Sequence, residues 1–166
     1  RKLDESKEGG AWYRMRLGEV LASQGRLTDA ARRLDAALAD HPKYPPALAA
    51  LGAVRAAEGK PAEAIRLYER AAAITPDVAT LAALADLYAR TGADFLAKAH
   101  RGAVEAADTD DTPFGRALVL YYCDHGTKLP RALDLARREL EARKDVYGYD
   151  ALAWALLKNG KPQEAE

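Results

Sequence analysis

The chain has 166 residues, of which 49% are hydrophobic and 30% are charged, a composition typical of a globular protein and not of a disordered one. Its 25 lysines and arginines balance its 25 aspartates and glutamates, which argues against a broad basic surface for nucleic acid or an anionic membrane. No apolar run approaches the length that spans a bilayer, and the single cysteine, Cys123, excludes an internal disulfide framework.

The first ten residues, 1–10, are polar and end in two glycines. We interpret them as a short helical lead-in or a frayed terminus. The chain begins at Arg1 without a signal-like segment and stops inside a predicted helix. We therefore interpret it as a piece of a longer protein, and the compartment, cytoplasmic or periplasmic, stays open. The alanine- and arginine-rich composition suggests a bacterial source.

From Ala11 onward, glycine recurs at successive spacings of 34, 33, 34 and 34 residues, at Gly25, Gly59, Gly92, Gly126 and Gly160. Each of these glycines follows an apolar stretch with a period near 3.6, which is typical of an amphipathic helix. A glycine in that place supplies the left-handed residue that ends a helix. A fixed period of this length predicts a repeat array.

The prolines indicate the same helix boundaries independently. Pro61, Pro130 and Pro162 follow a repeat glycine, where a second helix would start. Pro42 and Pro76 lie where that second helix would stop. Pro45, Pro46 and Pro113 lie where the next first helix would begin. The predicted helix pairs, in chain order, are 11–24 with 27–40, 46–58 with 61–74, 78–91 with 94–107, and 112–125 with 130–144. A fifth first helix at 148–158 follows, and its partner begins at Pro162. Few residues are β-branched and no long alternating run exists, so strands are not expected.

Small and large side chains recur in phase with these pairs. Alanine begins each second helix and allows close helix approach, at Ala30, Ala64, Ala97, Ala132 and Ala165. Leucine in each first helix is expected to fill the space between helices, at Leu17, Leu51, Leu84, Leu118 and Leu152. A single pair cannot bury its apolar face alone, so stability is expected to come from stacked neighbours.

At these positions the chain resembles the tetratricopeptide repeat family, whose unit has 34 residues. The second unit matches the motif at Leu48, Leu51, Gly52, Gly59, Ala64, Tyr68, Ala71 and Pro76. The third departs from it, with Arg101 where an aromatic residue is usual and Thr109 in place of proline, and the fourth has one extra residue before Ala132. The resemblance implies an all-α solenoid, a right-handed superhelix of antiparallel helix pairs with about four and a half units. These units are 11–44, 45–77, 78–111, 112–145 and the truncated 146–166.

The resemblance also implies that the first helices line a concave surface, which usually binds a peptide or a partner protein. By the register of the family, the candidate binding residues are Trp12, Met15, Glu19, Ala53, Ala56, Asp86, Arg90, Arg116, Leu120, Cys123, Trp154 and Lys158, with Ala49, Ala57, Ala82, Ala89, Asp124 and Asp150 beside them. The same residues could instead form a solvated inner face. Family members that grip a chaperone's C-terminal carboxylate use lysine and asparagine on their first helices. The single asparagine, Asn159, is predicted in a loop, so this clamp is absent.

No pattern predicts a metal, a cofactor or catalysis. Cys123 and His125 form a single C-x-H pair, whereas zinc requires three or four converging ligands. The acidic stretch at Asp108, Asp110 and Asp111 lacks the glycine and glutamate of a calcium loop, and Asp111 or Thr112 is predicted to cap a helix. Carboxylate pairs such as Glu139 and Glu141 are predicted to lie on a solvated, salt-bridged face, together with Arg137, Arg138, Arg143 and Lys144.

The sequence therefore predicts a noncatalytic protein–protein interaction scaffold that binds a peptide or partner protein in its concave groove. Neither nucleic-acid binding nor membrane insertion is expected. Two alternatives stay open. One is a structural module that self-associates through its truncated C-terminal unit, because terminal repeats need polar caps. The other is the regulatory arm of a larger enzyme or assembly complex.

Overall fold

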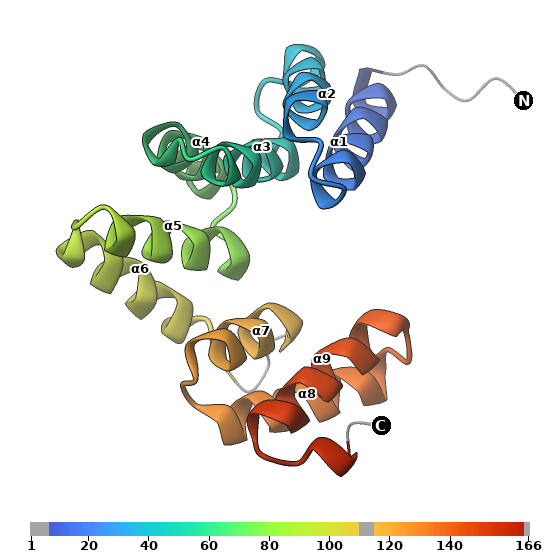
Figure 1. The fold of residues 1–166 in the computed structure, drawn as a ribbon, viewed down its shortest axis with the longest axis vertical. Helices are drawn as coiled ribbons and strands as arrows, with labels where there is room; N and C mark the ends of the chain where they lie inside the picture. Colours follow the sequence, from blue (N-terminus) through green and yellow to red (C-terminus); the bar gives the residue numbers. More distant parts are fainter. Residues whose placement is uncertain (1–6, 110–114, 165–166) are drawn as a thin grey trace, which may run out of the picture. The chain divides into compact units, whose positions relative to one another are not determined.

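The computed structural model describes residues 7–109 and 115–164, and all their regular elements are helices (Figure 1). The predicted all-α fold is therefore confirmed. The helices are α1 (Lys7–Ser23), α2 (Leu27–Asp40), α3 (Pro45–Ala57), α4 (Pro61–Ile74), α5 (Val78–Arg90), α6 (Asp94–Ala106), α7 (Gly115–His125), α8 (Leu129–Ala142), α9 (Val146–Lys158) and the 3-10 helix η1 (Pro162–Glu164). The chain divides into two compact units, unit 1 (Arg1–His100) and unit 2 (Arg101–Glu166).

The predicted helix boundaries agree closely with the observed ones. Helices α2 and α4 have the predicted bounds, and most of the others differ by one or two residues. Helix α1 is the largest exception because it begins at Lys7, so residues 7–10 are helical and continuous with the first predicted helix. Residues 112–114, where the seventh helix was predicted to start, lie outside the described residues, as does the cap predicted at Asp111 or Thr112.

All five repeat glycines have a positive φ, between 64° and 79°. This confirms that they supply the left-handed residue after each first helix, because a side chain at that φ would strain the backbone. The extra residue in the fourth repeat is accommodated by a second left-handed position. Lys128 occupies it with a φ of 44° and directly precedes α8. The longer connection thus reaches the start of α8 through two left-handed residues.

Helix pairs in unit 1 pack through small side chains, as predicted. Ala30 and Ala64 are fully buried at the starts of α2 and α4. A Cβ atom added to Gly18 would lie 2.7 Å from Cγ of Leu34, and one added to Gly52 would lie 3.0 Å from the ring of Tyr68. The paired helices therefore approach so closely that a larger residue would displace its neighbour.

We expect Ala64→Leu to destabilise unit 1 by about 1–3 kcal/mol, because three extra carbon atoms would overpack the contact between α3 and α4. Ala62→Leu is the matched control, since Ala62 lies exposed two residues earlier on the same helix. Its effect is expected to stay within about 0.5 kcal/mol. Urea unfolding followed by circular dichroism measures both variants. Equal losses of stability in the two variants would show that the contact around Ala64 has room for a larger side chain.

The predicted leucine positions do not all lie in the core. Leu51, Leu84 and Leu118 are buried, and Leu152 is half-buried. The prediction is wrong for Leu17, whose side chain is 42% exposed, whereas Leu51 at the equivalent repeat position is 4% exposed. Helix α2 packs against α3 and covers Leu51. Among the described residues, no helix precedes α1 to cover its corresponding face.

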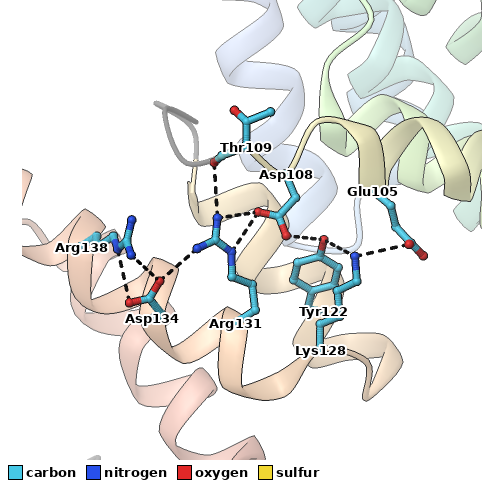
Figure 2. Close-up of polar contacts among 8 residues, drawn as sticks. All are labelled: Glu105, Asp108, Thr109, Tyr122, Lys128, Arg131, Asp134 and Arg138. Carbon is cyan, nitrogen blue, oxygen red and sulfur yellow. Dashed lines mark hydrogen bonds and ion pairs between the residues drawn. The ribbon is translucent and has the colours of Figure 1, made fainter.

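In unit 2, a polar network around Asp108 joins the end of α6 to α7 and α8 (Figure 2). The hydroxyl of Tyr122 donates a hydrogen bond of 2.9 Å to Oδ2 of Asp108. Arg131 donates to Oδ1 from Nε at 3.0 Å and from Nη2 at 2.9 Å. Lys128 lies 3.3 Å from the carboxylate of Glu105 and 5.3 Å from the centroid of the Tyr122 ring. These contacts fix α7 at both its core-facing tyrosine and its connection to α8.

Tyr122 and Tyr88 occupy equivalent positions in consecutive repeats, and each donates its hydroxyl to an acidic residue that precedes its own helix. Tyr88 donates to Glu69 of α4 at 2.5 Å. Burial and this hydrogen bond raise the pKa of Tyr88 to about 12. Burial and the bond to Asp108 likewise raise the pKa of Tyr122. Both hydroxyls therefore remain protonated donors at neutral pH.

Candidate functional site

Unit 2 contains a pocket of about 420 Å³ between two first helices, α7 and α9. Its wall is mainly apolar, and it is lined by Leu120, Asp150, Ala153, Trp154, Leu157 and Pro162. Residues three and four apart lie on the same face of a helix, so the spacing of the four α9 residues places them all on the pocket side. The predicted residues Leu120 and Trp154 therefore meet in one pocket.

Trp154 is held in place by two charged neighbours. Its indole Nε1 donates a hydrogen bond of 3.0 Å to Oδ1 of Asp124, on α7. The ammonium of Lys158 lies 4.5 Å from the centroid of the indole ring, a distance typical of a cation–π contact. The side chain thus presents an apolar ring surface with a fixed orientation. Lys158, also a predicted site residue, lies beside the pocket and does not line it.

Arg116, near the start of α7, provides a cation beside the same pocket. Its guanidinium carbon lies 5.1 Å from the centroid of the Tyr147 ring, and its Nη2 lies 3.9 Å from Oδ2 of Asp150. At that distance the ion pair is weak. The Nε of Arg116 is buried and has no hydrogen-bond partner. The pocket therefore has an apolar wall with both acidic and basic groups at its rim.

Two predicted site residues, Met15 and Cys123, are buried and cannot contact a partner in a groove. The prediction is wrong for both. Met15 belongs to the core cluster between α1, α2 and α3. Cys123 is fully buried because α7 packs against both α8 and α9 and has little free surface. Burial raises the pKa of its thiol, so Cys123 is a structural residue.

The predicted residues of unit 1 lie in more than one environment. Trp12, Ala53 and Arg90 are exposed or nearly so, whereas Glu19, Ala56 and Asp86 are closer to half-buried. Glu19 lines a pocket of about 550 Å³, together with Pro45, Pro46, Ala49, Ala50, Tyr68, Thr75, Asp77, Ala79 and Thr80. Helices α1 and α3 and the start of α5 all contribute residues to this pocket. Glu19 is the residue of the first repeat that was predicted as a site residue and lines it.

Sequence reasoning missed a third pocket, of about 520 Å³, which lies largely along second helices of unit 1. It is lined by Asp35, Leu38, Ala39, Pro42, Leu51, Arg55, Glu63, Arg66, Leu67 and Arg70. Arg55 forms ion pairs with Glu58 at 2.9 Å, Glu63 at 3.3 Å and Asp35 at 3.6 Å. These pairs connect α3 to α2 and α4, so the charge of Arg55 is balanced by carboxylates of the same unit. No periodic signal connects these residues in the sequence.

The prediction of a solvated carboxylate face on α8 is only partly right. Arg138 pairs with Asp134 at 3.0 Å and Arg137 with Glu164 at 3.4 Å, all at the surface. Oε2 of Glu139, however, is buried without a hydrogen-bond partner. A Cβ atom added to Gly115 would lie 3.0 Å from it. Glu139 therefore points toward α7 and not into solvent.

The ring of His125 lies back along its own helix, with Nδ1 at 2.8 Å from the carbonyl oxygen of Tyr121. Because a carbonyl oxygen only accepts, Nδ1 carries the proton and donates in this contact. Within residues 7–109 and 115–164, no group of three or more potential ligands lies close enough to hold a metal ion. In the same residues, none of the helices is both long enough and apolar enough to cross a bilayer.

Residues 21–85 match the model of the tetratricopeptide repeat family. Residues 21–85 therefore carry the tetratricopeptide repeat pattern. Its structure is similar to that of a thermophilic tetratricopeptide repeat protein from Thermus thermophilus, with a TM-score of 0.62 and 22% identity over 93% of this chain and 86% of the other. No curated protein matches the chain.

Two further solved tetratricopeptide repeat structures are similar to this chain. One, from Parabacteroides merdae, is 17% identical with a TM-score of 0.57, and the match covers 93% of this chain and 61% of the other. The second is YrrB, described as having an unusual peptide-binding site, which is 16% identical with a TM-score of 0.55 over 92% of this chain and 79% of the other. At these identities the likeness establishes the fold. Tetratricopeptide repeat proteins are in general noncatalytic modules for protein–protein interaction.

Proposed function

We propose that this chain is a noncatalytic interaction scaffold that binds a peptide segment of a partner protein in the pocket between α7 and α9. The observation that supports the proposal is the ring surface of Trp154 in a mainly apolar pocket on the first helices. Large aromatic side chains in such pockets contribute most to the affinity of protein interfaces. YrrB, a protein of the same fold, is described as having a peptide-binding site.

The ligand class follows from the wall and the rim of the pocket. Leu120, Ala153 and Leu157 surround the indole with apolar surface, which suits an aliphatic or aromatic side chain of the peptide as anchor. Asp150 and Arg116 offer one acidic and one basic group at the rim, which suits polar contacts to the peptide on either side of that anchor. A volume of about 420 Å³ accommodates a few side chains of a peptide and not a folded domain.

We expect peptides selected from a random display library to bind with a dissociation constant at least about tenfold higher when Trp154 is replaced by alanine, because the variant loses the aromatic anchor surface. The chain has two tryptophans, so Trp12→Phe leaves Trp154 as the fluorescent residue. Its emission on titration with a selected peptide then reports occupancy of the pocket directly.

Phe95→Ala is the matched control, because Phe95 is an aromatic residue that is 84% exposed on α6. It should leave the affinity of the selected peptides unchanged. Leu120→Glu, on the opposite wall of the pocket, should weaken binding as Trp154→Ala does. If the selected peptides bind all four proteins equally, the pocket between α7 and α9 is not the binding site. If the library gives no binder, the proposal of peptide recognition is wrong.

A further inference from the structure

The pocket of about 520 Å³ in unit 1 lies on a different set of helices from the predicted binding surface. We call it the second-helix pocket, because most of its lining residues come from α2 and α4, and both of these helices pack against α3. Its apolar lining consists of Leu38, Ala39, Pro42 and Leu67, together with the buried Leu51 of α3. None of the residues predicted for the concave surface lines this pocket.

The acidic groups of the second-helix pocket already have a partner within unit 1. Its two carboxylates, Asp35 and Glu63, both form ion pairs with Arg55. The side chain of Arg55 is only 18% exposed, so these pairs hold it between α2 and α4. The part of the pocket around Arg55 therefore offers no unbalanced positive charge to a ligand.

The two other arginines of the pocket, Arg66 and Arg70, are exposed. Arg66 forms no ion pair or hydrogen bond with any residue that the structure describes. Arg70 donates one hydrogen bond of 3.3 Å from Nη2 to the carbonyl oxygen of Pro42, which is a neutral acceptor. Because they are four residues apart on α4, the two arginines lie on one face of that helix. The pocket thus combines an apolar lining with two guanidinium groups that no carboxylate neutralises.

The helix repeat itself does not require arginine at these two places. When the second helices are aligned on the alanine that begins each of them, α6 carries Ala99 and Ala103 at the places equivalent to Arg66 and Arg70. A second helix of this fold therefore forms without either cation. The arginine pair is a feature of α4 and not of the repeat, which favours a role in binding over one in packing.

We propose that the second-helix pocket binds an acidic peptide segment of a partner protein. Two carboxylates of the segment pair with Arg66 and Arg70, and an aliphatic side chain packs against the apolar lining. Guanidinium groups bind carboxylates through two parallel hydrogen bonds, which suits a pair of exposed arginines. The volume of about 520 Å³ accommodates a few side chains. A small inorganic anion would satisfy the arginines but leave the apolar lining uncovered, so the combination favours a peptide.

The test uses peptides selected from a random display library on the Trp154→Ala variant, whose unit 2 pocket lacks its aromatic surface. We expect the selected peptides to carry two or more acidic residues close to an aliphatic one. Replacing both Arg66 and Arg70 with glutamine should raise the dissociation constant about tenfold, because two exposed charge pairs are lost. Ala39→Glu should also weaken binding, since it places a carboxylate inside the pocket. Fluorescence anisotropy of labelled peptides measures each affinity, and added salt should lower it.

A double variant with Arg33→Gln and Lys98→Gln is the matched control. It removes the same charge from unit 1 at two exposed positions that do not line the second-helix pocket. This control should bind the selected peptides as Trp154→Ala alone does, and circular dichroism checks that every variant is folded.

Four results would overturn the proposal. The selection could yield no binder, or its peptides could lack the acidic residues. The control could weaken binding as much as the loss of Arg66 and Arg70, which would indicate a general effect of charge. Inorganic pyrophosphate could compete as strongly as the peptides, which would indicate a phosphate site. Because all of these measurements are made with Trp154→Ala, they do not depend on whether the unit 2 pocket binds a peptide.

Discussion

Replacing Asp108 with alanine is expected to destabilise unit 2 by about 2–4 kcal/mol. The Asp108 side chain is 9% exposed and accepts three hydrogen bonds, one from Tyr122 and two from Arg131 (Figure 2). The substitution leaves the buried hydroxyl of Tyr122 and the largely buried guanidinium of Arg131 without that acceptor. Both groups were removed from water on folding, and each then lacks a hydrogen bond that replaced its contacts with water. It also removes a connection that joins the end of α6 to α7 and α8.

Two controls separate the carboxylate's role from a general effect of substitution. Tyr122→Phe removes one of the three hydrogen bonds and should cost about 1 kcal/mol. Asp134→Ala removes an acidic residue that pairs with Arg131 at 3.1 Å, but its side chain is 45% exposed. This change should cost less than about 1 kcal/mol. Urea unfolding measures the totals, and hydrogen exchange in α7 and α8 locates the loss. Equal costs for Asp108→Ala and Asp134→Ala would contradict the prediction.

The same network predicts how the stability of unit 2 depends on pH. Burial alone would raise the pKa of Asp108, but the hydrogen bonds from Arg131 and Tyr122, with the charges of Arg131 and Lys128, hold the pKa below its ordinary value of 3.8. A carboxyl whose pKa is lower in the folded state stabilises the fold above its unfolded pKa and loses that contribution on acidification. We expect this contribution to stability to be lost as the pH falls below 3.8, and the loss to be less steep in Asp108→Asn. Urea unfolding at a series of acidic pH values measures both.

Replacing Leu51 with alanine is expected to destabilise unit 1 by about 2–4 kcal/mol, whereas Leu17→Ala should cost less than about 1 kcal/mol. The two leucines occupy the same position in consecutive repeats, and the substitution removes the same atoms from each. Leu51 is 4% exposed under α2, so its loss leaves a cavity in a packed core. Leu17 is 42% exposed, so solvent already contacts much of its side chain.

Urea unfolding followed by circular dichroism measures this difference. The slope of the free energy of unfolding against urea concentration should stay the same in both variants, because each is expected to change stability and not the amount of surface exposed. Equal losses for Leu51→Ala and Leu17→Ala would contradict the prediction, because they would mean that the Leu17 side chain is as well packed as that of Leu51.

The candidate site was predictable only in part, for a reason visible in α7. The family register predicted Leu120 and Trp154 on one surface, because a helix period determines which residues share a face, and both residues line one pocket. The register could not predict that Leu120 lines the pocket while Cys123 is buried, since both residues lie on the same turn of the helix. Cys123 is buried because α7 packs against two helices at once. Burial at such positions depends on neighbours that are distant in sequence.

The sequence by itself determined the helices, their pairing and the ends of most of them. These features depend on contacts within a repeat of 34 residues, and they are encoded by recurring glycine, proline and alanine. Only the tertiary structure decided which equivalent positions are covered, as with Leu17 and Leu51, and which charges meet, as with Asp108 and Arg131. The physical reason is that burial and ion pairing depend on which surfaces approach one another, and a local pattern repeated in sequence is the same whether or not a neighbour covers it.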